Sequence, residues 1–344
     1  MKVGVDTFTL YPLNLDPFEQ LDFIKAAGLD GAQFGGLRSL SKNLELSELK
    51  AVRERADSLG LYSHVSLSVA CNPHLVAGSA DEHRQAACQE IELAAQCGWH
   101  ELHSTLGGGD ERYLHAVPWP QQLADSALFI RSLAPVLRQH GSRIDLETHG
   151  DSTTFELVRL IEDVGPDCVG ICLDTANVMC HCEEPVAAVR RAAPYTHLTH
   201  TKDAVVFFSE RGYVRQTVPP GRGAIEWEKV LPVLAAHSPN LPMSIEDHKW
   251  LFYFHGFDPA WLALHPDLTL EEYASFMQLI WKCQQRLAAG EFMDPLEYDK
   301  IPYASEVNER LQSGRDYLKS MIARLGLGDC PHDDTPRSLS MMRP

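Results

Sequence analysis

The feature that most constrains this chain is a regular alternation of short apolar runs with longer segments of helical period. Eight runs rich in β-branched and apolar residues alternate with segments in which apolar residues recur every three or four positions. The predicted strands are 3–9, 31–34, 62–67, 101–105, 143–148, 169–174, 197–202 and 242–247. Eight such units over about 250 residues are typical of a (β/α)₈ barrel. We therefore predict an α/β fold of the TIM-barrel type.

An open, doubly wound sheet is the alternative fold. Such a sheet normally has about six strands, and a Gly-x-Gly-x-x-Gly turn usually follows its first strand. This chain has no such turn after its first predicted strand. Gly28, Gly60, Gly98 and Gly141 follow four of the helical segments, at positions where a left-handed residue commonly ends a helix.

The predicted organisation has three parts. Residues 1–250 are expected to form the barrel and 251–327 a C-terminal helical extension packed on it. Residues 328–344 are rich in Pro, Asp, Ser and Arg, which predicts a mobile tail. A dense aromatic run at 250–254 is interpreted as packing or as a wall of the barrel mouth, with sugar stacking as the alternative.

Charge and composition exclude several classes of partner. The formal net charge of -17 disfavours binding to nucleic acid or to anionic membrane surfaces. The sequence has no apolar run near the roughly 20 residues that span a bilayer, and no signal-peptide pattern, so we expect a cytoplasmic protein. The nine cysteines are odd in number and form no Cys-x-x-Cys pair, which predicts reduced thiols. Cys180-His181-Cys182 offers too few ligands for a structural zinc site.

Polar side chains stand where four successive predicted strands end: Glu147, Asp174, His200 and Glu246. In a (β/α)₈ barrel the chemistry lies at these carboxyl ends, and neighbouring strands are about 4.8 Å apart. A lone carboxylate at a strand end is more often solvated or caps a helix. Four polar residues at the ends of successive strands predict that their side chains converge on one divalent ion. Three carboxylates and one imidazole suit Mn²⁺ best, with Mg²⁺ and Co²⁺ as alternatives.

Other residues near these strand ends are candidates for contact with a substrate. His149 lies two residues after Glu147 and is a candidate catalytic acid or base. His103, Lys202 and Arg222 are candidate substrate-binding residues, each with a structural role as the alternative.

At these positions the chain resembles the sugar phosphate isomerase/epimerase superfamily, whose barrels are similar to xylose isomerase. The resemblance covers about residues 1–250. The matching pieces are LETHG at Glu147, CLDTAN at Asp174, His200-Thr-Lys202-Asp203, the loop PGRGAIEW around Arg222, and SIEDH at Glu246. The resemblance implies that Glu147, Asp174, His200 and Glu246 hold the metal and that the two glutamates move protons. Asn177 stands where members often have a histidine, so no substrate contact is carried over there.

The expected activity is metal-dependent isomerisation or epimerisation of a keto sugar or sugar derivative through an enediolate. In its longer C-terminal part and in having His149 beside Glu147, the chain also resembles the catalytic subunits of C-glycoside deglycosidases. These lyases cleave 3-oxo-glycosides together with a smaller partner subunit. An inosose-type dehydratase, and a noncatalytic sugar-binding or assembly protein, remain alternatives. An abasic-site nuclease of the endonuclease IV type needs several zinc ions and a basic surface, which this acidic chain lacks. The expected partner is a small sugar, and we expect a homo-oligomer with a smaller second subunit as a further option.

Overall fold

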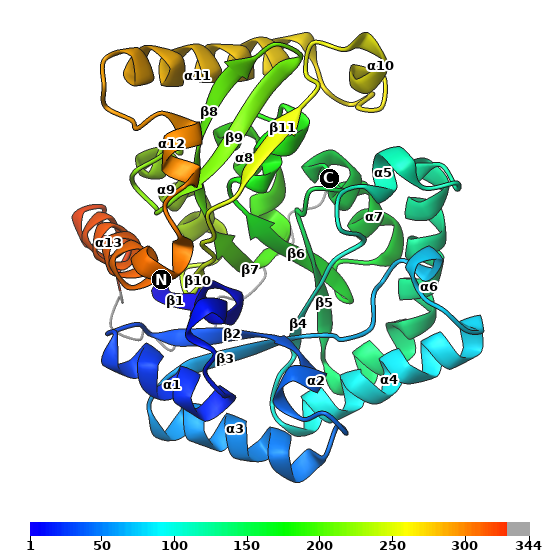
Figure 1. Ribbon diagram of the computed structural model, residues 1–344. Coiled ribbons are helices and arrows are strands. Elements are labelled where there is room, and N and C mark those ends of the chain that lie inside the picture. The colour runs from blue at the N-terminus through cyan, green and yellow to red at the C-terminus, as the bar shows by residue number, and fades with distance from the viewer. Residues whose placement is uncertain (329–344) are drawn as a thin grey trace, which may run out of the picture.

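The eight predicted strands form a closed parallel barrel in the computed structural model, which describes residues 1–328 (Figure 1). Around the barrel the strands follow the order β1-β10-β7-β6-β5-β4-β3-β2. Their bounds are β1 (Lys2–Asp6), β2 (Gly31–Gly36), β3 (Tyr62–Ser66), β4 (Glu101–Ser104), β5 (Arg143–Glu147), β6 (Val169–Asp174), β7 (Thr196–Thr201) and β10 (Pro242–Ile245). The predicted fold class is therefore confirmed. The first strand is shorter than predicted because the Asp6 side chain caps the 3₁₀ helix that starts at Thr7.

Helices surround the barrel in the expected alternation. They are α1 (Pro17–Ala26), α3 (Leu46–Ser58), α4 (Ala80–Gln96), α6 (Trp119–His140), α7 (Thr154–Val164), α8 (Pro185–Ala192) and α9 (Trp227–His237). Capping boxes at Asp16, Ser79 and Thr153 start three of them by satisfying free backbone N–H groups. Gly141 ends α6 in the left-handed conformation.

The chain beyond residue 250 is largely helical, as predicted. It contains α10 (Pro259–Leu262), α11 (Leu270–Ala288), α12 (Pro295–Asp299) and α13 (Tyr303–Arg324). Helix α13 packs against β1, β10 and α9, which is the place of the eighth barrel helix. The division of the chain at residue 250 stays a prediction, and the predicted tail, residues 328–344, lies outside the described part except for residue 328.

A second sheet, which the sequence analysis did not predict, stands beside the barrel. It consists of β8 (Asp203–Ser209), β9 (Gly212–Val218) and β11 (Leu251–Phe254), paired antiparallel in the order β11-β9-β8. β8 and β9 form a hairpin directly after β7, and α11 packs on β8 (Figure 1). The aromatic run at 250–254 therefore includes a strand.

Short elements fill the remaining connections. They are η1 (Thr7–Leu13), α2 (Leu37–Leu40), η2 (Pro73–Leu75), α5 (Glu111–Leu114), η3 (Asn177–His181) and η4 (Ala193–Tyr195). Within residues 1–328, no helix has the length and apolar character needed to cross a membrane. The eight cysteines in this part of the chain are all free thiols.

A polar cluster lies at the amino-terminal ends of the barrel strands, opposite the strand ends with the candidate ligands. One polar atom from each of Glu101, Asp145 and His197 lies within 4.8 Å of the others, and Asp145 Oδ1 lies 3.1 Å from Nδ1 of His197. Gly170 on the intervening strand makes room, because a Cβ there would overlap both Asp145 and His197. Burial raises the pKa of Asp145 to about 7; burial and the charge of Asp145 raise the pKa of Glu101 to about 8.

Glu101→Gln should reduce the loss of stability at alkaline pH. Unfolded carboxyl groups have pKa values near about 4, so the folded protein holds these protons more tightly than the unfolded chain. Stability should then fall as the pH rises from about 4.5 toward 8. We expect the melting temperature of the variant, relative to wild type, to rise between about pH 5.5 and about pH 8.5. Glu92→Gln, a substitution at an exposed position on α4, is the control. Melting temperatures of Glu101→Gln and wild type that change in parallel with pH would contradict the expectation.

Candidate metal centre

The structure brings the four predicted strand-end ligands together. One donor atom from each of Glu147, Asp174, His200 and Glu246 lies within 4.8 Å of the others. Strand register explains the convergence, because Asp174 on β6 is the direct partner of His200 on β7, which in turn pairs with Ser244 on β10. All four side chains are buried, with at most 8% of the residue surface exposed. A metal ion at their centre would be shielded from bulk water.

The polar atoms of this cluster fit a divalent cation. Asp174 Oδ2, His200 Nδ1 and Glu246 Oε2 are buried and have no hydrogen-bond partner within the described residues. Leaving such atoms buried without hydrogen bonds is costly, and a divalent cation would satisfy all of them. Three carboxylate oxygens and one imidazole nitrogen form a mainly hard ligand set, which suits Mn²⁺, Mg²⁺ or Co²⁺.

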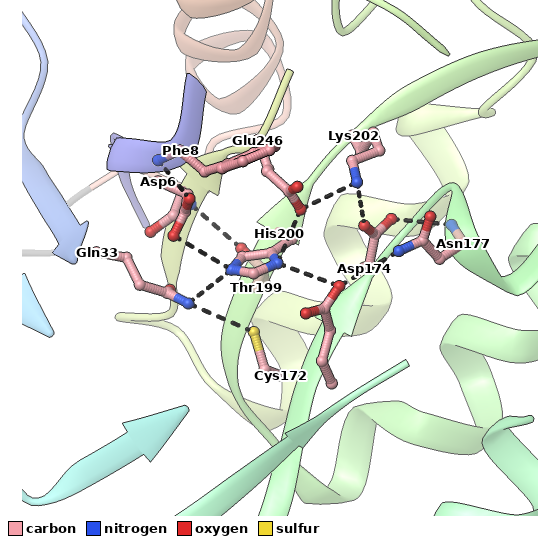
Figure 2. Close-up of polar contacts among 12 residues, drawn as sticks. Asp6, Phe8, Gln33, Cys172, Asp174, Asn177, Thr199, His200, Lys202 and Glu246 are labelled. Carbon is pink, nitrogen blue, oxygen red and sulfur yellow. Dashed lines mark hydrogen bonds and ion pairs between the residues drawn. The ribbon is translucent and has the colours of Figure 1, made fainter. Parts of the chain in front are cut away.

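The charges within the cluster support the same conclusion. Lys202 is in direct contact with two of the carboxylates: its Nζ lies 2.8 Å from Oδ2 of Asp174 and 3.0 Å from Oε2 of Glu246 (Figure 2). These are ion pairs without hydrogen-bond directionality. Burial raises the pKa of Asp174, and the charges of Glu246 and Glu147 raise it further although Lys202 opposes them. The cluster thus holds more negative charge than its own lysine balances.

The orientation of His200 is set from the opposite side of its ring. Nε2 lies 2.7 Å from the Gln33 amide nitrogen and 3.5 Å from Oδ2 of Asp6 (Figure 2). The Gln33 oxygen has no partner, so rotating the amide would let it accept the Nε2–H. Nδ1 faces Glu246 Oε2 at 2.9 Å and Glu147 Oε1 at 3.3 Å. Burial lowers the pKa of His200, but these carboxylates and other neighbours outweigh it and raise this pKa well above its usual value, so Nδ1 carries a proton that a bound metal would displace. Nδ1 is therefore the atom available to a metal.

Sequence reasoning missed the role of Gln33 and Asp6. A usable signal was present, because Gln33 is a lone polar side chain within the apolar part of β2 and Asp6 ends β1.

Three of the other predicted residues line the cavity above the cluster: His103, His149 and Lys202. His103 Nε2 lies 3.0 Å from Glu147 Oε2, and its Nδ1 lies 2.7 Å from the Ser66 hydroxyl. His149 Nδ1 is buried without a partner in the described chain. Burial disfavours a charged Lys202, but Asp174 and Glu246 outweigh this and raise its pKa.

Arg222 is not among the residues that line the cavity. Its side chain is 55% exposed and lies 3.6 Å from Glu309. The loop that carries it is instead held by Asp203, whose carboxylate accepts hydrogen bonds from the backbone of Gly221 and Gly223 and from other donors of the loop. A Cβ on Gly223 would overlap Asp203, so the glycines of this motif are explained by loop folding.

The cavity has a volume of about 900 Å³ and a strongly aromatic wall. Trp250, Phe252, Tyr253 and Phe254 all line it, in agreement with the interpretation of this run as a mouth wall. Tyr253 is 60% exposed whereas Glu147 is 3% exposed, so the polar cluster lies at the deep end. Asn177 and Arg215 also line the cavity, and neither was among the predicted site residues.

Comparisons with known proteins agree with the fold. The chain is 24% identical over 208 residues to the uncharacterized protein YihM of Escherichia coli, a match covering 60% of this chain and 56% of that protein. It is similar to D-psicose 3-epimerase with D-tagatose from Clostridium cellulolyticum H10, with a TM-score of 0.61, 14% identity and coverage of 94% and 99%. The 3-keto-D-glucoside 4-epimerase YcjR from E. coli gives a TM-score of 0.53 and 17% identity over 82% of this chain and 100% of YcjR.

The family model described as xylose isomerase-like TIM barrel matches residues 21–260, well over half of the sequence. This match confirms the resemblance that the strand-end motifs indicate. The chain belongs to the xylose isomerase-like TIM barrel family.

Proposed function

We propose that this protein is a divalent-metal-dependent isomerase or epimerase of a keto sugar or sugar derivative. The observation that carries the proposal is the buried quartet of Glu147, Asp174, His200 and Glu246, in which three of the atoms that could bind a metal have no hydrogen-bond partner among the described residues. The similar structures named as a D-psicose 3-epimerase and a 3-keto-D-glucoside 4-epimerase support the same class of reaction.

The quartet would hold the ion, whose chemistry is Lewis-acid stabilisation of the negative charge that develops on substrate oxygens. Glu147 and Glu246 come from β5 and from the end of β10, strands separated by β6 and β7, and so approach a bound sugar from different directions. Removal of a proton from one face by one glutamate and return on the other face by the second inverts the carbon. Return to the neighbouring carbon gives an aldose–ketose isomerisation.

The local charges keep both glutamates ready to accept a proton. Burial opposes their ionisation, but Lys202 and His200 lower the pKa of Glu246 well below its usual range. His200 and His149 do the same for the pKa of Glu147. Both are therefore carboxylates at neutral pH, as a general base requires.

Elimination from a 3-oxo-glycoside or an inosose is the second candidate function. The observation that favours it is the aromatic part of the cavity, since a free hexose bonds mainly through hydroxyl groups. A volume of about 900 Å³ is also at the upper end of the range of pockets for drug-sized ligands. An apolar aglycone would fill this outer part. A homo-oligomer and a smaller second subunit stay predictions.

Incubation in D₂O with Mn²⁺ and a panel of ketoses, inososes and 3-oxo-glycosides tests the proposal. Enolisation should introduce carbon-bound deuterium, which NMR detects, and elimination should also release an aglycone or water. A chain that binds sugars but exchanges no C–H with any of them would be a binding protein.

Glu246→Gln should separate metal binding from proton transfer. The amide keeps an oxygen ligand but cannot accept the proton, so most of the metal should remain while turnover falls by a factor on the order of 10² or more. Metal content by mass spectrometry and turnover are measured on the same preparation. Glu271→Gln, an exposed change on α11, should behave as wild type. Loss of metal in parallel with activity would leave Glu246 as a ligand without a demonstrated base function.

His149→Ala should distinguish epimerisation from elimination. In a two-glutamate epimerase both proton transfers are assigned, so deuterium exchange into a ketose should change little. In an elimination, an imidazole side chain can act as the acid or base that assists departure of the aglycone. Release should then be abolished while exchange at the enolisable carbon partly survives. Exposed His237 supplies the control variant His237→Ala. Inert ketoses together with aglycone release that needs His149 would contradict the epimerase proposal.

A further inference from the structure

Five lysine and arginine side chains are buried in the described part of the chain, and four of them have a carboxylate partner. Arg112 pairs with Glu156 at 2.7 Å and Lys202 with Asp174 at 2.8 Å. The other two pairs are Lys249 with Glu306 at 2.7 Å and Arg310 with Asp247 at 2.6 Å. Arg215, 2% exposed, is the exception: within residues 1–328 it has no carboxylate oxygen within 4.0 Å.

The surroundings of Arg215 place it within the candidate active site. It projects from the middle of β9 and lines the cavity. Its Nη1 donates to Asn177 Oδ1 at 2.5 Å, and Asn177 donates from Nδ2 to Oε1 of Glu147 at 3.2 Å. The guanidinium carbon lies 5.1 Å from the centre of the Phe252 ring, and Nε has no acceptor among the described residues. One neutral amide thus separates this cation from a proposed catalytic carboxylate.

A buried guanidinium without a counter-ion is unfavourable by several kcal/mol. Asn177 and the Phe252 ring compensate only part of this, because neither carries a negative charge. Since Arg215 lines the cavity, a ligand can supply the missing charge. We propose that the cavity takes an acidic sugar and that Arg215 binds its carboxylate. The inference rests on the proposed function in assuming that the ligand is a sugar.

A carboxylate fits this surrounding better than a phosphate. Arginine matches carboxylate geometry with parallel N–H donors, and one unpaired positive charge balances one negative charge. A phosphate monoester carries about −1.5 to −2 at neutral pH and three strong acceptor oxygens. The other cavity cation, Lys202, is already paired with Asp174 and Glu246, and the wall beside Arg215 is aromatic.

The test compares three ligands that differ only at C6: D-fructose, D-fructuronate and D-fructose 6-phosphate. Calorimetry with the full-length, Mn²⁺-supplied protein gives their affinities without requiring turnover. We expect fructuronate to bind at least about tenfold more tightly than fructose, as for a hydrogen bond to a charged group. Arg215→Gln should abolish this preference for fructuronate over fructose. Arg211→Gln, exposed at the turn of the same hairpin, should keep it.

Arg215→Lys supplies a second variant if the glutamine form does not fold, and it should keep the charge but lose most of the preference. Equal affinities for fructose and fructuronate, or a preference that survives in Arg215→Gln, would overturn the proposal. Tighter binding of the phosphate than of the carboxylate would overturn it as well. A carboxylate preference without deuterium exchange on any sugar would contradict the proposed reaction and leave this inference standing. Deuterium exchange on a sugar, together with equal affinities for fructose and fructuronate, would support the proposed reaction and overturn this inference.

Discussion

The excess of negative charge at the carboxyl end of the barrel is the constraint on which the site depends. Glu147, Asp174 and Glu246 are buried side by side, and Lys202, which contacts Asp174 and Glu246, supplies a single positive charge against three carboxylates. Burying like charges is unfavourable unless protons or cations compensate them, and the raised pKa of Asp174 shows the tendency to retain a proton. A bound divalent cation removes that need. Metal binding and the ionised state of Asp174 are therefore linked.

The second sheet supplies one wall of the cavity above the barrel. β8 and β9 leave the barrel directly after β7, and β11 pairs with β9. This arrangement brings Arg215 and Phe252, which are cross-strand partners, to the same wall. Asp203, at the start of β8, fixes the returning loop through its backbone hydrogen bonds. The barrel ends position the polar quartet, and the added sheet determines what surrounds it.

The barrel and the quartet could be predicted because both depend on local patterns. An apolar strand followed by a polar residue is visible in the sequence, and the closed barrel brings successive strand ends together. Arg215 could not be predicted in the same way. Its position depends on β9 pairing with β8 and β11, and pairing between segments about 35 residues apart leaves no periodic signal. For Arg222 the sequence pattern was misleading. Its glycine-rich loop suggested a ligand site, but the loop needs glycine because it folds closely around Asp203.

The two kinds of cation in the cavity have different roles for the same electrostatic reason. Lys202 touches two of the carboxylates, so its charge is neutralised within the quartet and contributes little to a distant ligand. Arg215 reaches Glu147 only through the neutral Asn177, so its charge is not cancelled by contact. A ligand that binds between them meets a lysine whose charge is neutralised by carboxylates and an arginine whose charge is not. Charge recognition in this cavity therefore belongs to Arg215, and Lys202 acts on the carboxylates of the quartet.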